Sequence, residues 1–181
     1  MSLSQTQGRV SALARLSMND AFERLRAVVS VTDARSFDST TLLDVYEAAL
    51  TIEREQSARR SLRNTRRLKP FLDGLQRYTK CVDILCNGTP YLPWIWAPVR
   101  LLIQLASDYA SAFDKLLAEY RHIADVLPRF DRLSEAFREN PDFQHVLAMV
   151  YVDILAFHEK AYKFFCKPGR SLSSIHSFLA Y

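Results

Sequence analysis

Glycine is scarce in this chain of 181 residues, which has 4 glycines and 7 prolines. Folds made of many short strands need such residues in their frequent turns, so the composition disfavours an all-β fold. The glycines are isolated along the chain, and no G-x-x-x-x-G-K-S/T motif is present. A phosphate loop needs this motif to bring backbone N–H groups onto the anion. We therefore expect this chain to bind no nucleotide.

Cysteine is also scarce, and a secretory signal is missing. Cys81, Cys86 and Cys166 are odd in number and lack C-x-x-C spacing. They are predicted to be small buried side chains in a reducing compartment. Residues 1–16 contain no apolar core of signal-peptide length. We therefore expect a cytoplasmic protein.

The residue combinations that carry catalysis or bind metals are missing too. No nucleophile motif accompanies the scattered histidines, which are His122, His145, His158 and His176. Glu119 and His122 have the Glu-x-x-His spacing of di-iron bundles, and Asp142 and His145 echo it. However, Glu119 falls off the apolar face of its predicted helix, and Asp142 occupies a helix start, where capping explains it. We expect neither enzyme activity, nor a metal, nor a cofactor.

Apolar residues at helical spacing are present almost throughout the chain. A capping-box-like pair, Ser17–Asp20, predicts the first helix, and residues 32–40 are predicted to be a polar connector. One of residues 38–40 is expected to cap a helix whose buried face carries Leu43, Tyr46 and Leu50. The last long helix has a wide predicted stripe with His158 at the core edge; its members are Phe143, Val146, Leu147, Val150, Ile154, Phe157, Ala161 and Phe164.

These patterns predict an all-α fold: a single bundle of five to seven helices around one central apolar helix. Pro70 fits the first turn of one helix, and Asn87-Gly88 is typical of its end. Residues 1–36 are expected to form a partly flexible helical segment. The bundle domain would span 37–167, and 168–181 would be a poorly ordered tail.

The most apolar run, residues 91–106, raises the question of membrane insertion. It has 16 residues and contains two prolines and Arg100. A spanning helix needs about 20 apolar residues, so a buried central helix is favoured, although contact with lipid in a second state stays open. The candidate core or insertion residues are Trp94, Trp96, Leu101, Leu102 and Phe113.

Positive charge is concentrated in residues 53–69, which carry seven lysines or arginines and two glutamates. Their net charge of +5, against +4 for the whole chain, leaves −1 for the rest. The segment is typical of a solvated helix face, but it also suits an anionic lipid surface or an acidic partner. Nucleic acid is not expected, because no reader motif accompanies the charge. The candidate contact residues are Arg54, Arg59, Arg60, Arg63, Arg66, Arg67 and Lys69.

Two blocks resemble the uncharacterised helical domain at the N-terminus of fungal NACHT-type STAND (NLR-like) proteins. The first comprises Trp96-Ala97-Pro98, Leu101-Leu102, Leu105-Ala106-Ser107, residues 112–117, Tyr120, Ile123 and Leu127-Pro128. The second comprises Val150-Tyr151, residues 153–155, Phe157-His158, Ala161 and Phe164-Phe165. Phe71-Leu72, Leu75 and Tyr78 fit the preceding helix, so the resemblance covers roughly residues 40–167. The Goodbye and HeLo-like domains are similar more loosely.

The resemblance implies a helical effector or adaptor domain that precedes a nucleotide-binding switch and acts in non-self recognition and regulated cell death. It is a packing pattern and transfers no functional residue. This sequence departs from the family by ending at Tyr181 without a phosphate loop.

From the pattern we expect a non-catalytic signalling domain that binds a protein partner, or itself, through helix–helix contacts. The alternative is a membrane-active bundle that binds anionic lipid through its arginine-rich helix and promotes cell death. The identity of the partner and the trigger are not encoded in any motif of the chain.

Overall fold

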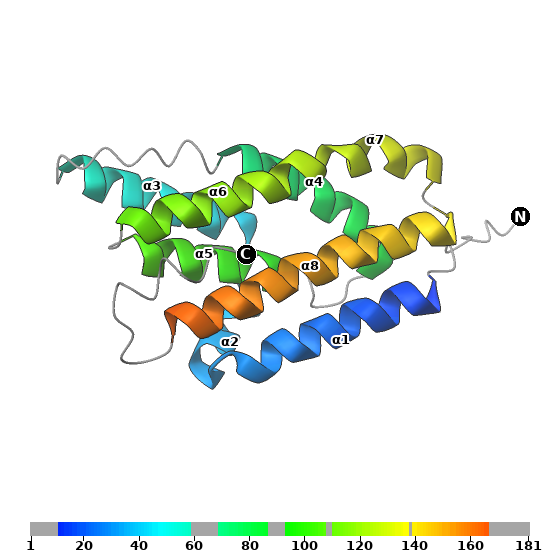
Figure 1. Ribbon diagram of the computed structural model, residues 1–181, viewed down its shortest axis with the longest axis horizontal. Helices are drawn as coiled ribbons and strands as arrows, with labels where there is room; N and C mark the ends of the chain where they lie inside the picture. The colour runs from blue at the N-terminus through cyan, green and yellow to red at the C-terminus, as the bar shows by residue number, and fades with distance from the viewer. Residues whose placement is uncertain (1–10, 59–68, 87–92, 108–109, 138, 167–181) are drawn as a thin grey trace, which may run out of the picture.

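The computed structural model describes residues 11–58, 69–86, 93–107, 110–137 and 139–166, which form eight α-helices and no β-strand (Figure 1). The helices are α1 (Ala12–Val28), α2 (Val31–Phe37), α3 (Leu42–Ala58), α4 (Lys69–Cys86), α5 (Pro93–Ala106), α6 (Ala110–Val126), α7 (Pro128–Phe137) and α8 (Pro141–Phe165). The predicted all-α bundle is confirmed.

Helix α2 lies inside the predicted polar connector, which raises the number of described helices above the five to seven expected. Its start is fixed by Ser30, whose hydroxyl accepts a hydrogen bond from the backbone N–H of Asp33 at 3.1 Å. The same hydroxyl donates to the Asp33 carboxylate at 2.8 Å. This reciprocal capping stabilises a short helix that has little apolar periodicity of its own.

Helix α1 begins earlier than the sequence pattern suggested. The helix starts at Ala12, and Ser17, the predicted cap, lies in its interior. Ser11 precedes the first turn, and its backbone N–H donates to the Gln144 side chain at 2.7 Å. The prediction of a cap at Ser17 was therefore wrong. The N–H of Ser11 has no partner within α1 and donates instead to a side chain of α8, which no local pattern reveals.

Helices α1 and α8 lie side by side and run in the same direction (Figure 1). At one end Ser11 bonds to Gln144, and at the other the backbone N–H of Ser30 donates to the Tyr162 hydroxyl at 2.9 Å. The sequence separations of these pairs are 133 and 132, so the register is nearly constant along α1. Helix α1 packs into the same core as the later helices. Residue 36, where the first segment was expected to end, lies within α2.

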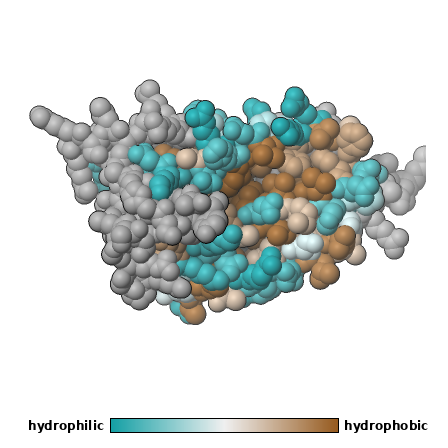
Figure 2. Space-filling model, viewed as in Figure 1, coloured by the Kyte–Doolittle hydropathy of each residue, from teal (hydrophilic) through white to brown (hydrophobic). Residues whose placement is uncertain are grey.

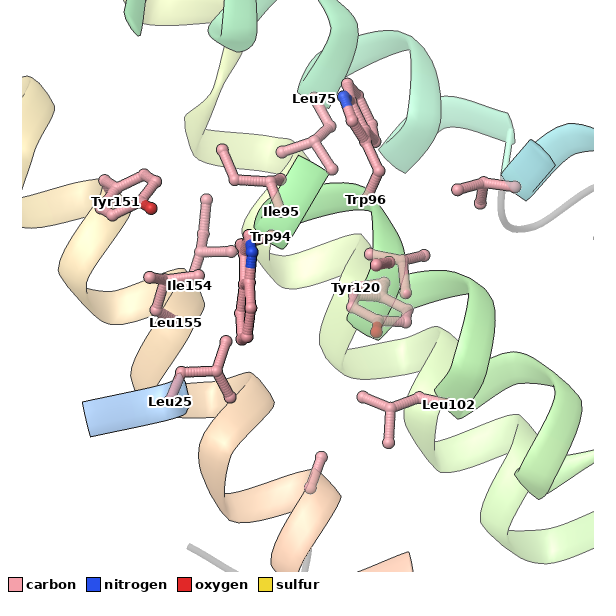
Figure 3. Close-up of a cluster of buried hydrophobic side chains, with 14 of the residues drawn as sticks. Leu25, Leu75, Trp94, Ile95, Trp96, Leu102, Tyr120, Tyr151, Ile154 and Leu155 are labelled. Carbon is pink, nitrogen blue, oxygen red and sulfur yellow. The ribbon is translucent and has the colours of Figure 1, made fainter. Parts of the chain in front are cut away.

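Helix α5 crosses the centre of the bundle. All residues from Trp94 to Val99 are buried, including Pro98 inside the helix. Figure 3 shows Trp94 beside Leu25 of α1 and the Ile154–Leu155 turn of α8, while Trp96 lies next to Leu75 of α4. Among the described helices, none combines the length and apolar character needed to cross a bilayer.

Helix α3 exposes much of the face that the sequence predicted to be buried. It packs mainly against α5, and its buried residues are Val45, Ala48, Ala49 and Ile52. Leu43 is 65% exposed and Leu50 is 50% exposed, so the predicted Leu43/Tyr46/Leu50 face was wrong at two of its three positions. These four residues form the face of α3 that packs against α5, and Leu43 and Leu50 lie outside that face.

Two further predictions of detail were wrong. Thr41, and none of residues 38–40, caps α3: its backbone N–H donates to the Asp44 carboxylate at 2.6 Å. In α8, Val146 belongs to the predicted stripe but is 50% exposed, whereas His158, expected at the core edge, is fully buried. The buried face of α8 is rotated because it must contact α1 as well as α5.

Candidate interaction surfaces

The most deeply buried polar pair joins α6 to α8. The Tyr120 hydroxyl lies 3.4 Å from Nε2 of His158, and both side chains are fully buried. Nδ1 of His158 has no hydrogen-bond partner among the described residues. Burial lowers the pKa of His158 to about 3, so the imidazole is neutral at physiological pH. Both side chains are enclosed by the core, so neither reaches the surface.

Three half-buried contacts tie the helices together at their ends. Tyr162 of α8 donates to the Asp33 carboxylate at 2.6 Å, and the indole N–H of Trp94 donates to Asp38 at 3.1 Å. The Tyr46 hydroxyl donates to Asp73 at 2.9 Å, and burial together with this carboxylate raises the pKa of Tyr46 to about 12. Since each group is paired within the fold, these contacts are best explained by packing.

The two spacings that suggested metal ligands do not converge on a site. His122 is exposed, and Asp142 lies in the first turn of α8, where Asn140 is the cap. Within the described residues, no group of three or more histidine, cysteine, aspartate or glutamate side chains is arranged to hold a metal ion.

Most of the predicted basic contact surface lies outside the described residues. This applies to Arg59, Arg60, Arg63, Arg66 and Arg67. Arg54 at the end of α3 and Lys69 at the start of α4 are described, and both are exposed. Lys69 forms an ion pair with Asp73 at 2.8 Å, which lowers the pKa of that carboxyl group. The role of the basic segment stays a prediction.

The candidate core or insertion residues lie in the centre of the bundle. Four of them, Trp94, Trp96, Leu102 and Phe113, are at most 6% exposed. Leu101 is half-buried at the edge of the same core. Phe113 belongs to α6 and the other four residues belong to α5, so the set spans two helices that pack together.

A surface of exposed apolar side chains lies across three helices. Its members, the α1/α7/α8 surface from here on, are between 41% and 67% exposed: Leu13, Leu16, Leu133, Phe137, Val146 and Met149. Figure 2 shows hydrophobic surface gathered on the half of this face where α7, α8 and the start of α1 lie. Apolar patches that extend over several elements mark interaction sites more often than single exposed leucines do.

Two observations place these helices against one another. The rings of Phe137 on α7 and Phe143 on α8 are 6.4 Å apart, and Val146 follows Phe143 by one helical turn. Leu13 and Val146 differ by 133 in sequence, as do Leu16 and Met149, which is the separation of the bonded pair Ser11 and Gln144. The leucines of α1 therefore lie at the same levels along the bundle as the apolar residues of α8.

A pocket of about 380 Å³ lies between α3 and α5. Asp44, Glu47 and Glu55 line it from α3, and Arg100 faces them from α5. Hydrogen bonds from Thr41 and, less strongly, the charge of Arg100 lower the pKa of Asp44. The pocket is therefore negative overall, with three carboxylates against one guanidinium.

The sequence reasoning assigned no role to this pocket or to the α1/α7/α8 surface. Residues 42–58 carry two apolar lines, Leu43/Tyr46/Leu50 and Val45/Ala48/Ala49/Ile52, and the spacing alone does not decide which of them is buried.

Comparison with known families gives one result. Residues 66–180, more than half of the chain, match the family described as "Domain of unknown function (DUF7708)". The match includes α4 to α8 and leaves α1 to α3 outside it. No curated protein and no solved structure matches the chain.

Proposed function

The chain belongs to the DUF7708 family of domains of unknown function, and from its surface we propose that it is a non-catalytic helical interaction domain. The observation that carries the proposal is the α1/α7/α8 surface, a set of exposed apolar side chains on three helices, of which α1 packs on α8 and α7 meets α8 through Phe137 and Phe143. Such a surface suits helix–helix contact with another protein chain. A second copy is the first candidate partner, because an apolar patch is complementary to itself across a two-fold axis.

The finer proposal is an effector or adaptor of the fungal STAND type, located in the cytoplasm and acting in regulated cell death. The residues that resemble the STAND N-terminal domain from Phe71 onward all lie in the part of the chain that matches the DUF7708 family. In such an arrangement a nucleotide-binding module elsewhere would control when the helical surface is available.

Sedimentation velocity of the whole chain, from low to high micromolar concentration, tests this proposal. We expect reversible self-association, weakened about 100-fold by the paired changes Leu16→Glu and Val146→Glu, since like charges then face each other across the contact. Both side chains are at least half exposed, so the fold should survive, which circular dichroism checks. Leu43→Glu on α3 is the matched control and should leave association unchanged. A chain that stays monomeric at every concentration would contradict pairing between copies.

The membrane-active alternative is separated by flotation and dye leakage with anionic liposomes. Insertion of α5 would remove Trp94, Trp96 and Leu102 from the core, and burial of each such side chain stabilises the fold by about 1.5–3 kcal/mol. We therefore expect no leakage at physiological salt. Leakage that is abolished by changing Arg59, Arg63, Arg66 and Arg67 to glutamate would favour the alternative instead.

A further inference from the structure

Helix α3 presents a line of exposed residues beside the α3/α5 pocket. Leu43, Glu47 and Leu50 are spaced at i, i+4 and i+7 and therefore share one face of the helix. The two leucines are 65% and 50% exposed. Ala48 and Ile52, which lie on the buried side of the same helix, line the pocket next to this face. An apolar strip thus lies directly beside a concave, polar site.

The charges of this site are unbalanced. Glu47 and Glu55 are exposed, and neither makes an ion pair with another described residue. Arg100 is half-buried on the opposite wall and also acts on Asp44, the one pocket carboxylate that Thr41 already engages. Two carboxylates at the mouth of the pocket are therefore available to an incoming cation.

We propose that the α3/α5 pocket and the leucines beside it form a docking site for a basic amphipathic helix of a protein partner. Two lysine or arginine side chains of that helix enter the pocket mouth and pair with Glu47 and Glu55, which lie about 12 Å apart along α3. Apolar side chains one turn away pack on Leu43 and Leu50. Arg100 repels a deeper cation, so the charged groups are held at the mouth.

The chemistry of the site selects this occupant over others. Phosphate groups of lipids or nucleic acids would meet three carboxylates and be repelled. A free metal ion or small amine would leave the two leucines uncovered. This site lies on α3 and α5, shares no residue with the α1/α7/α8 surface, and does not depend on the function proposed above.

Two matched synthetic peptides test the proposal with the whole chain. Both are short, fluorescein-labelled helices with leucines at i and i+7; one carries arginines at i+3 and i+4, and the other carries glutamines there. In fluorescence anisotropy we expect saturable binding of the arginine peptide and at least about tenfold weaker binding of the glutamine peptide. Rising salt should weaken binding of the arginine peptide and hardly affect binding of the glutamine peptide.

Variants of the protein locate the binding. Glu47→Gln combined with Glu55→Gln should weaken binding of the arginine peptide about three- to tenfold, as expected for two exposed ion pairs. Leu50→Ser should weaken binding of both peptides. Asp153→Asn, which removes one exposed carboxylate on α8, is the control for the loss of negative charge away from the pocket and should change nothing.

Three results would overturn the inference. They are equal affinity for the two peptides, equal loss in the Asp153→Asn control and in the Glu47/Glu55 variant, or no binding at low salt. All the substituted side chains are exposed, so thermal unfolding should give the same Tm for each variant as for the parent. If the double variant nevertheless unfolds, Glu47→Gln alone and Leu50→Ser carry the same test.

Discussion

Helices α3 and α5 pack against each other, yet they differ in how far their large apolar residues are buried. Helix α5 buries every residue from Trp94 to Val99, including two tryptophans and a proline. Helix α3 buries Val45, Ala48, Ala49 and Ile52 and leaves Leu43 and Leu50 exposed. Hydrophobicity alone would have buried the leucines first. The comparison shows that the position of an apolar residue relative to the neighbouring helices decides whether it joins the core.

The number of neighbours explains the contrast. Helix α5 packs against α2, α3, α6 and α8, so almost every direction around it is occupied by protein. Helix α3 has one main neighbour, α5, and its opposite side faces solvent. A helix that is enclosed by neighbours, such as α5, must be apolar all round, whereas a helix with one neighbour, such as α3, needs only one apolar line.

The largest predicted effect separates the two helices by their stability contributions. Trp94→Ala should lower the free energy of unfolding by about 3–5 kcal/mol, because the cavity it leaves adds to the lost burial. In the fold its ring packs edge-on against Phe22 and Phe37, with centroids 5.0 and 5.2 Å away. Leu43→Ala on α3, an apolar truncation at an exposed site, should change the same quantity by less than about 0.5 kcal/mol. Urea unfolding followed by circular dichroism measures both.

A partial rescue sharpens this prediction. Trp94→Phe keeps an aromatic ring in the site but removes the indole N–H that donates to Asp38. Its cost should lie well below that of Trp94→Ala. Equal losses for the two substitutions would mean that the hydrogen bond, and not the packing of the ring, holds α5 against α2.

The fold class could be predicted because helical periodicity is a local property of the sequence. The proline at the start of α4 and the Asn140-Pro141 pair before α8 mark helix starts directly. Helix α2 could not be predicted so easily, since its seven residues include one buried side chain, Phe37. The start of α1 depends on Gln144, a residue 133 positions away in the sequence. No single-sequence pattern carries that information.

The candidate surfaces were harder to predict than the core. Trp94 and Leu102 could be assigned to a central helix from the apolar run alone. Leu43 and Leu50 could not be assigned to the surface, because the sequence shows that they share a face but not which neighbour that face meets. A pocket between two helices requires their packing to be known. It therefore has no signature in either helix taken alone.

The buried His158 and the exposed His122 repeat the contrast between buried and exposed sites, and the pH dependence of stability tests it. The pKa of His158 is about 3 in the fold and near its ordinary value of 6.5 in the unfolded chain. Between these values the unfolded state binds more protons, so stability is complete above pH 6.5 and falls as the pH drops toward 3. The slope should approach about 1.4 kcal/mol per pH unit in this window. Urea unfolding at several pH values measures it.

Two histidine variants separate this effect from general acid sensitivity. His122 is exposed, so His122→Gln should keep the full pH dependence. His158→Leu removes the buried imidazole and should flatten the curve, whatever its effect at neutral pH. An unchanged slope in His158→Leu would show that His158 is not the group responsible.

The smallest effect concerns the face of α3 that packs against α5. Val45 is fully buried on the face of α3 that packs against α5, and Val45→Phe should cost about 1–3 kcal/mol, because the added ring separates α3 from α5 or forces strained rotamers. Leu50→Phe enlarges an exposed residue on the opposite side and should be neutral within about 0.5 kcal/mol. Thermal unfolding of the two variants compares them directly. If both are neutral, α3 packs loosely enough to accept a larger side chain. Val45 would then not lie in a tightly packed contact between α3 and α5.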